Sequence, residues 1–214
     1  MGEMLRFGGT LELAGIRQSV SGFSPDDLPL AVALILVIVG LLFKLGAVPF
    51  HMWVPDVYAG SPTSVTAYLA SAPKIAAFVI VLRLLATSLE PLIEVWQDML
   101  IAVALLSIGF GNLVAIAQRN IKRMLAYSTI SHMGFFLLGI LSGDSVGYSA
   151  AMLYAVIYAV TSLGVFGCIL HYSREGFEAD QLDDYRGLSK TDPLSLIHIS
   201  EPTRPLYISY AVFC

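Results

Sequence analysis

Residues 43–58, FKLGAVPFHMWVPDVY, decide the fold of this chain. They place Lys44, two prolines and a histidine directly after residues 28–43, which carry no charged side chain. An uncharged apolar run of this length is typical of a membrane helix. Pro49 removes a backbone donor and disfavours helical angles at the residue before it, so a break next to Lys44 is predicted. A broken helix at membrane depth is tolerated only inside protein or beside water, and we therefore expect Lys44 in the interior of a helix bundle.

A second lysine, Lys74, interrupts the next apolar segment, residues 64–85. At about 1.5 Å per residue it lies roughly 15 Å deep, near the middle of a hydrocarbon core about 30 Å thick. Pro73 directly precedes it and predicts a kink. Burial disfavours the charged form of a lysine, which lets it exchange a proton as neighbouring charges change. Lys44 and Lys74 are therefore candidate members of a proton relay. The alternative is that each forms a fixed structural ion pair.

The composition indicates an integral membrane protein. Of the 214 residues, 57% are hydrophobic and only 13% are charged, which is more apolar than soluble domains are. The net charge of -4 and the scattered basic residues do not indicate a nucleic-acid partner, and none is expected. Cys168 and Cys214 lie far apart in the sequence, so neither a disulfide framework nor a metal site is expected. The first 27 residues contain no apolar segment typical of a signal peptide.

The hydropathy pattern predicts an all-α, polytopic membrane helix bundle with about five transmembrane helices, in a domain that covers residues 28–173. Residues 1–27 form an extramembrane connection with one possible surface helix near residues 11–16, and residues 174–193 form a polar loop. The loop at 118–123 is the most basic in the chain, so it is expected to face the cytoplasm, together with residues 174–193. The predicted crossings are residues 28–58, 64–85, 99–116, 124–141 and 148–172.

The fourth and fifth predicted helices each carry a polar face. Ser128, Ser131 and His132 follow the i, i+3, i+4 spacing that places them on one side of a helix. His132 titrates in the range useful for proton transfer and is a possible relay residue; a hydrogen-bonded packing histidine is the alternative. Tyr154 and Tyr158 form a similar seam, and we expect them to be hydrogen-bond partners between helices.

Two aromatic side chains of the opening stretch have a simpler interpretation. His51 and Trp53 are expected in the aromatic belt at the membrane interface.

The last residues, 194–214, differ in character from the rest of the chain. Residues 194–204 and 208–214 are translations of sequencing-adapter DNA in one reading frame, and the three residues between them have the length of an index. We expect this segment to be adapter-derived rather than native, and we assign no function to its side chains.

The residues around the two lysines resemble the antiporter-like membrane subunits of bacterial respiratory complex I, the proton-pumping NADH:quinone oxidoreductase. The resemblance rests on residues 40–85, with the core PFHMWVPD and its continuation PDVYAGSP, and is supported by residues 111–134 and by YRGL at 185–188. The Mrp-type cation/proton antiporters share the PxHxWxPD core, whereas the PDVYxGxP continuation resembles the N type of complex I subunit more than the other types.

The resemblance implies a larger antiporter-like fold with two inverted repeats, broken helices and central lysines that form a proton path. It assigns Lys44 to the broken seventh helix and Lys74 to the eighth, so that this chain resembles roughly helices seven to eleven. A glutamate of the fifth helix and an ionisable residue of the twelfth helix would complete the path.

The implied function is that of a proton-translocating membrane subunit, which couples quinone reduction elsewhere in the complex to proton pumping. The chain would thus be a subunit of a translocase without a redox site of its own. NADH, FMN, iron–sulfur clusters and quinone would be bound by other subunits, because this sequence has neither a GxGxxG after a strand nor a cysteine cluster. The expected partners are the other membrane subunits of complex I and the lipid bilayer, in a bacterial inner membrane. Two alternatives stay open: a Mrp-type cation/proton antiporter subunit, and a structural membrane subunit without a proton path.

Overall fold

The computed structural model describes residues 12–21, 28–174 and 176–185. Within these residues the chain is helical and contains no β-strand. The described part has five segments that are long and apolar enough to cross a membrane: Leu28–Leu45, Thr63–Ser88, Glu90–Ile116, Ile121–Leu141 and Ser145–Tyr172. The prediction of an all-α bundle with about five membrane helices is therefore confirmed. Residues 194–214, which we expect to be adapter-derived, lie outside the described residues.

The first membrane helix is broken where the sequence predicts. Helix α3 (Leu28–Leu45) ends at Gly46, whose φ of 80° is accessible to glycine at little cost. The amides of Gly46 and Ala47 donate to the carbonyls of Phe43 and Leu42, a Schellman motif that closes the helix. After the non-helical connection at 46–52, the chain resumes as α4 (Trp53–Gly60).

The second membrane helix is also interrupted, but two residues earlier than predicted. Helix α5 (Thr63–Ala70) ends at Ser71, and α6 (Ala72–Arg83) begins directly after it. Pro73 is the second residue of α6, where its missing amide leaves no intrahelical bond unmade. The helix then loosens into a π-helical turn, η1 (Leu84–Ser88), and a short 3₁₀ turn, η2 (Glu90–Leu92).

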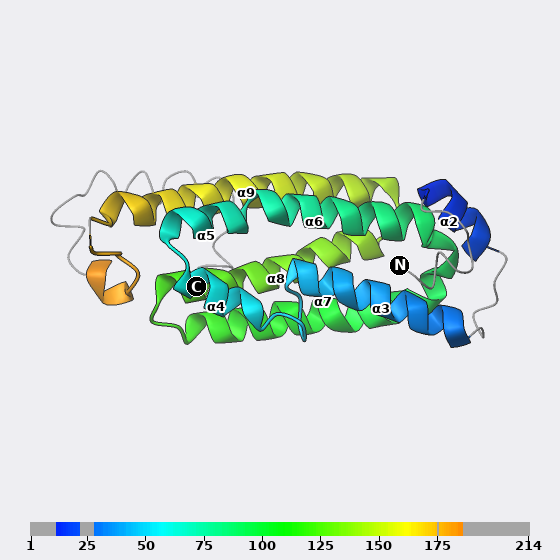
Figure 1. The fold of residues 1–214 in the computed structure, drawn as a ribbon, viewed down its shortest axis with the longest axis horizontal. Helices are drawn as coiled ribbons and strands as arrows, with labels where there is room; N and C mark the ends of the chain where they lie inside the picture. Colours follow the sequence, from blue (N-terminus) through cyan, green and yellow to red (C-terminus); the bar gives the residue numbers. More distant parts are fainter. Residues whose placement is uncertain (1–11, 22–27, 175, 186–214) are drawn as a thin grey trace.

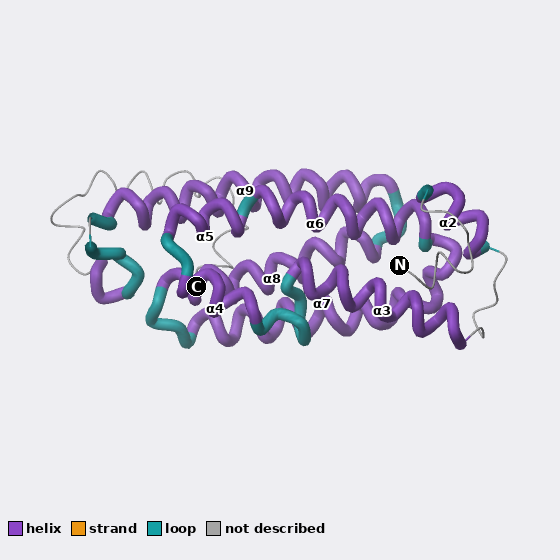
Figure 2. Tube along the Cα trace, viewed as in Figure 1, coloured by secondary structure: helices purple, strands orange, loops and turns teal. Residues whose placement is uncertain are grey.

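Three long helices complete the bundle: α7 (Ile93–Ile116), α8 (Ile121–Leu141) and α9 (Ser145–Tyr172). Figure 1 shows α5 and α6 beside α9 along one side, and α3 and α4 beside α7 and α8 along the other. Figure 2 shows that the non-helical connections gather at the two ends, apart from the breaks between α3 and α4 and between α5 and α6.

Helices α7 and α8 pack closely because two glycines lie between them. A Cβ at Gly134 would come within 2.7 Å of the Ala104 carbonyl oxygen, and one at Gly111 within 2.7 Å of the Ser131 amide nitrogen. Large apolar side chains such as Phe78, Trp96 and Phe136 are buried in the core beside this pair. Other apolar side chains, including Leu36, Leu105 and Val160, are exposed on the outer faces of the helices. An apolar outer face of this kind is what a lipid bilayer requires.

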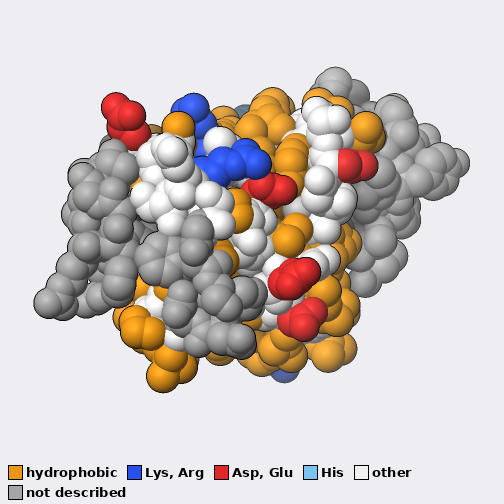
Figure 3. Space-filling model, turned by 90° about the vertical axis from the view of Figure 1, so that its right-hand side faces the viewer, with side chains coloured by type: hydrophobic (Ala, Val, Ile, Leu, Met, Phe, Trp, Pro, Cys, Tyr) orange, Lys and Arg blue, Asp and Glu red, His pale blue; other side chains and the backbone are white. Residues whose placement is uncertain are grey.

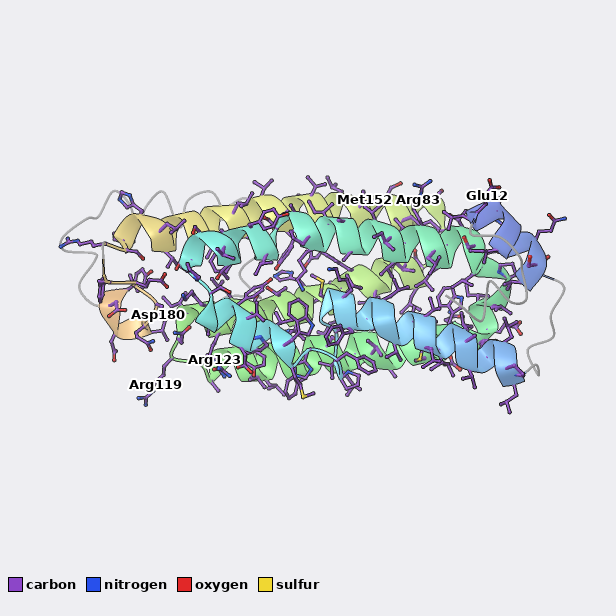
Figure 4. The ribbon with its side chains drawn as sticks, in the orientation of Figure 1. Glu12, Arg83, Arg119, Arg123, Met152 and Asp180 are labelled. Atoms are coloured by element: carbon purple, nitrogen blue, oxygen red, sulfur yellow. The ribbon has the colours of Figure 1, made fainter. Side chains whose placement is uncertain are left out.

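The connections divide between two ends of the bundle. The turn at 61–62, the loop at 117–120 and the segment 173–185, which includes the 3₁₀ turn η3 (Leu182–Tyr185), lie together at what we call the basic end. Arg119, Arg123 and Asp180 are labelled there in Figure 4. Because the membrane helices alternate in direction, this arrangement agrees with the predicted order of crossings.

The opposite end carries α2 (Leu13–Val20), a surface helix close to where one was predicted. Its buried side chains, Ile16 and Val20, belong to the main core. Arg17 forms an exposed ion pair with Glu90 at 2.7 Å. Figure 3 shows this end face, on which acidic and basic side chains both appear beside apolar ones.

Three helices begin earlier than predicted. Helix α7 begins at Ile93 instead of near Met99, and it includes Glu94 and Asp98 in its first turns. Helix α8 begins at Ile121 instead of near Met124, and α9 begins at Ser145 instead of near Tyr148. In α7 and α8, charged residues that were assigned to connections extend the helix past the apolar stretch, because helices of membrane proteins continue beyond the hydrocarbon core.

Candidate functional site

The side chain of Lys74 is buried at the break of the first membrane helix. It is 2% exposed, and its Nζ donates a hydrogen bond of 2.7 Å to the backbone carbonyl of Leu45. Leu45 is the last residue of α3, so its carbonyl has no acceptor role within the helix and is free for a donor from elsewhere. The partial negative charge at a helix C-terminus also favours a cation there. The break in α3 thus creates the acceptor that holds Lys74.

The ring of Trp53 covers the same ammonium group. Lys74 Nζ lies 4.9 Å from the Trp53 ring centroid, within the range of a cation–π interaction. The indole Nε1 donates to the Phe43 carbonyl at 2.9 Å, which fixes the ring against the end of α3. The expectation that Trp53 belongs to an interfacial belt did not include this contact with Lys74, and the belt itself stays a prediction.

Gly46 brings these groups together. A Cβ at Gly46 would lie 2.5 Å from a methyl carbon of Val54 and 3.4 Å from Lys74 Nζ. The residue therefore needs both its positive φ and the absence of a side chain. Among the described residues no carboxylate forms an ion pair with Lys74, so backbone, ring and helix end are its stabilising neighbours.

Lys44 is not buried by the described residues, and the expectation that it lies in the interior of a helix bundle stays a prediction. Its side chain is exposed on the last turn of α3. The buried face of α3 is formed by residues spaced three or four apart, including Ile38, Leu42 and Leu45. Lys44 follows Leu42 by two residues and thus points away from that face.

The connection after the break is anchored to α7 by a serine that sequence reasoning missed. The Val48 amide donates to Ser107 Oγ at 2.9 Å, and Ser107 is fully buried. Burying a backbone amide in an apolar medium without a hydrogen bond costs about 4 kcal/mol of free energy. Ser107 gives no sequence signal, since a lone serine in an apolar helix is common.

His132 joins a second polar group between α8 and α9. Its Nδ1 lies 2.6 Å from the hydroxyl of Tyr154, and its ring centroid lies 4.8 Å from that of Tyr158. The Tyr158 hydroxyl donates to Thr129 Oγ1 at 2.8 Å. Both tyrosines are thus partners between helices, as predicted. Ser131 is buried, and its Oγ makes no hydrogen bond to the described residues.

A buried lysine at the basic end was also missed. Lys122 was assigned to the exposed basic loop, but it lies in the first turn of α8 and is 2% exposed. It pairs with Glu178, whose pKa is lowered mainly by the hydrogen bond from Lys122. Its burial depends on Glu178, which lies 56 residues later in the sequence, and no local sequence pattern predicts that contact. In the described part of the chain, no group of three or more histidine, cysteine or acidic residues could hold a metal ion.

Comparison with known proteins agrees with this arrangement. The chain is 54% identical over 185 residues to NADH-quinone oxidoreductase subunit N of Thiobacillus denitrificans, which covers 86% of this chain and 38% of that protein. It is 60% identical over 167 residues to subunit N of Thioalkalivibrio sulfidiphilus, covering 78% of this chain and 35% of that protein. The chain therefore spans less than two fifths of the length of these two relatives.

Solved structures of respiratory complex I and of an Mrp complex also match this chain. A chain of respiratory complex I from Thermus thermophilus matches with a TM-score of 0.69 and 35% identity, over 90% of this chain and 40% of that chain. A chain of the Mrp complex from Dietzia sp. matches with a TM-score of 0.80 but 24% identity, over 92% and 36%. The second likeness shows the fold alone.

The family assignment rests on most of the sequence. The family model described as "NADH:quinone oxidoreductase/Mrp antiporter, TM" matches residues 1–200, which include both lysines, the two helix breaks and His132. The resemblance noted at residues 40–85 is confirmed by these matches. The chain belongs to the NADH:quinone oxidoreductase/Mrp antiporter transmembrane family.

Proposed function

We propose that this chain is part of a proton-translocating membrane subunit of NADH:quinone oxidoreductase, and that Lys74 carries the proton in this part of the path. The observation that carries the proposal is the burial of Lys74 Nζ against the Leu45 carbonyl at the end of a broken helix. An ionisable group at membrane depth is costly to bury, and such groups usually serve ion or proton pathways.

The surroundings of Lys74 suit both protonation states. The ammonium form is stabilised by the carbonyl, the Trp53 ring and the C-terminus of α3, whereas burial favours the neutral amine. A neutral amine keeps two N–H donors, so the hydrogen bond to Leu45 survives loss of the proton. Lys74 can therefore release a proton without losing its position.

Lys44 is the second proposed member of the relay. It lies on the last turn of α3, directly before Leu45, whose carbonyl binds Lys74. The exposed face that carries Lys44 would pack against a further helix in the longer relatives, where the resemblance implies a glutamate. We propose that Lys44 exchanges protons with that carboxylate and then with Lys74, and that His132 continues the relay beyond it.

Several features belong to the whole subunit and are proposals for this chain. NADH, FMN, iron–sulfur clusters and quinone would be bound by other subunits of the complex. Partners would be the other membrane subunits and the lipid of a bacterial inner membrane, with the basic end in the cytoplasm. We propose residues 1–27 as an extramembrane connection, 28–173 as the membrane domain and 174–193 as a cytoplasmic loop. We also propose that residues 194–214 are adapter-derived and stand in place of further membrane helices. Sequencing the source DNA with different adapters tests this.

The test is Lys74→Ala in the full-length protein within its complex. We expect proton pumping per NADH oxidised to fall while assembly and electron transfer persist, because only the proton carrier is removed. Arg83→Gln is a matched control, since Arg83 is an exposed cation at the far end of the same helix. Normal pumping by an assembled Lys74→Ala variant would contradict the proposal.

A second variant distinguishes the proposed relay from a structural subunit without a proton path. Lys44→Met together with Lys74→Met removes both charges at similar side-chain length. A fixed ion-pair role predicts normal pumping once this variant has assembled, whereas a relay predicts none through this subunit. A Mrp-type role is distinguished by whether neighbouring genes encode peripheral redox subunits.

A further inference from the structure

A second buried lysine lies far from the proposed relay, at the basic end. Lys122 Nζ donates to the Ser61 carbonyl at 3.0 Å and to a carboxylate oxygen of Glu178. Lys122 is 2% exposed, whereas Glu178 is 43% exposed. A buried charge is tolerated only when its hydrogen bonds are made, so Lys122 requires both acceptors.

Glu178 contacts a third segment as well. Its carboxylate accepts hydrogen bonds from the Thr63 amide at 3.3 Å and from Thr63 Oγ1 at 3.2 Å. We call Ser61, Thr63, Lys122 and Glu178 the clasp. It joins the turn between α4 and α5 to the start of α8 and to the segment that follows α9.

The charges of the clasp match the helix ends they contact. Ser61 is the C-cap of α4, where a cation is favoured, and it receives Lys122. Thr63 is the first residue of α5, where an anion is favoured, and it binds Glu178. Each charge thus serves one particular helix end, and exchanging the two would oppose both dipoles.

Helix α5 connects the clasp to Lys74. Its eight residues span about 12 Å, with Thr63 at one end and the break at Ser71 at the other. Lys74 lies in the first turn of α6, and its amide donates to the Ser71 carbonyl at 3.1 Å. A shift of Thr63 along the helix axis would therefore reach Lys74 through α5 and the hydrogen bond at Ser71.

We propose that Lys122 and Glu178 are positioning residues for proton transfer. The clasp holds the Thr63 end of α5 and thereby keeps Lys74 Nζ within hydrogen-bond distance of the Leu45 carbonyl. This inference rests on the proposed function of Lys74. Proton transfer is sensitive to distance, and a displacement of about 1 Å of a reacting group can slow a reaction by about 10²-fold. The clasp acts through α5 and has no contact with the transferred proton.

The experiment uses the full-length protein in its complex and measures protons translocated per NADH oxidised at equal amounts of assembled complex. Lys122→Met with Glu178→Gln removes the clasp without leaving a buried charge. We expect a loss of the same sign as that of Lys74→Ala, but smaller, with electron transfer retained. Thr63→Val keeps the ion pair and removes one of its bonds to α5, and it should give a still smaller loss. A normal ratio in assembled complexes of these variants would overturn the proposal.

A charge exchange separates the clasp from a simple ion pair. Lys122→Glu with Glu178→Lys keeps the attraction but places a carboxylate against the Ser61 carbonyl and an ammonium against the Thr63 amide. We expect the number of protons translocated per NADH oxidised to stay low in this variant. A full return to the normal number would show that pairing of the two charges alone matters, and it would overturn the proposed role of the clasp. Arg123→Gln is the matched control, because Arg123 also joins α8 to α4, through an exposed pair with Asp56 at 3.1 Å, and it should leave the ratio unchanged.

The Lys74→Ala variant makes the two proposals distinguishable. If it lowers the ratio and the clasp variants do not, only the clasp is wrong. If Lys74→Ala itself leaves the ratio normal, the proposed function is wrong.

Discussion

Lys74 is held by groups that other residues supply through their backbone and shape. Its acceptor is the Leu45 carbonyl, and the space beside its Nζ exists because Gly46 has no side chain. The position of one ionisable residue is thus decided by the conformation of a helix end 29 residues earlier. At this scale the sequence identified the lysine, while the structure supplied its acceptor.

Gly46→Ala should disturb the site. The alanine costs about 1–2 kcal/mol in the left-handed region, and its Cβ would approach Val54 to 2.5 Å, which forces a shift. We expect less assembled complex and lower proton pumping in what assembles. Gly40→Ala, in the interior of α3, has no atom within 4 Å of its new Cβ and should stabilise the helix by about 0.5–1 kcal/mol. Equal thermal stability of the two variants would contradict this account.

The two broken helices are the elements that build the site. The break between α3 and α4 leaves two backbone groups without helical partners, and each is satisfied by a specific side chain: Lys74 for the Leu45 carbonyl and Ser107 for the Val48 amide. In a medium without water such partners are obligatory. The break between α3 and α4 is therefore fixed in place by side chains from α6 and α7.

At the basic end, stability should depend on acid pH through Glu178. The hydrogen bond from Lys122 lowers the pKa of Glu178 below its ordinary value of 4.5. A carboxyl group with a lowered pKa stabilises the folded state above its ordinary pKa, and this contribution is lost as the pH falls through the lowered value. Because Glu178 is 43% exposed, solvent screening keeps the effect small.

Hydrogen exchange of the Thr63 amide measures this dependence. Protection, corrected for the intrinsic exchange rate, should fall as the pH is lowered below 4.5. Glu178→Gln should show no such change, since its amide does not titrate. A pH dependence that persists in Glu178→Gln would assign the effect to another group.

Local sequence patterns predicted the helices and their breaks well. They could not predict contacts between segments that lie far apart in the sequence. The break of α3 follows from Gly46 and Pro49, which act on their own backbone. The burial of Lys122 depends on Glu178, and the exposure of Lys44 depends on which face of α3 the other helices cover. The early start of α7 was missed because Glu94 resembles a connection when only hydropathy is considered.

For the whole molecule, the alternating helices place the connections at two opposite ends, as the predicted crossings require. The loop before α8 and the segment after α9 are joined by backbone hydrogen bonds from Ile121 to Asp180 and from Leu182 to Arg119. Helix α8, with 21 residues, is about 32 Å long, enough to span the hydrocarbon core.

Labelling with a membrane-impermeant thiol reagent tests this topology. In a Cys168→Ala background, Arg119→Cys should react only from the cytoplasmic side and Ser145→Cys only from the opposite side. Both positions are exposed at the two ends of α8 and at the start of α9. Reaction of both from the same side would contradict a membrane-spanning α8.

The Leu45 carbonyl has a consequence for genetics. Every amino acid carries a backbone carbonyl, so no change of codon at this position deletes the acceptor of Lys74. Screens for loss of function will recover the donor, the glycine that admits it and the ring that covers it, while the acceptor itself stays invisible. Replacing the peptide bond after Leu45 by an ester, which weakens that carbonyl as an acceptor, is the chemical substitution that would reveal it.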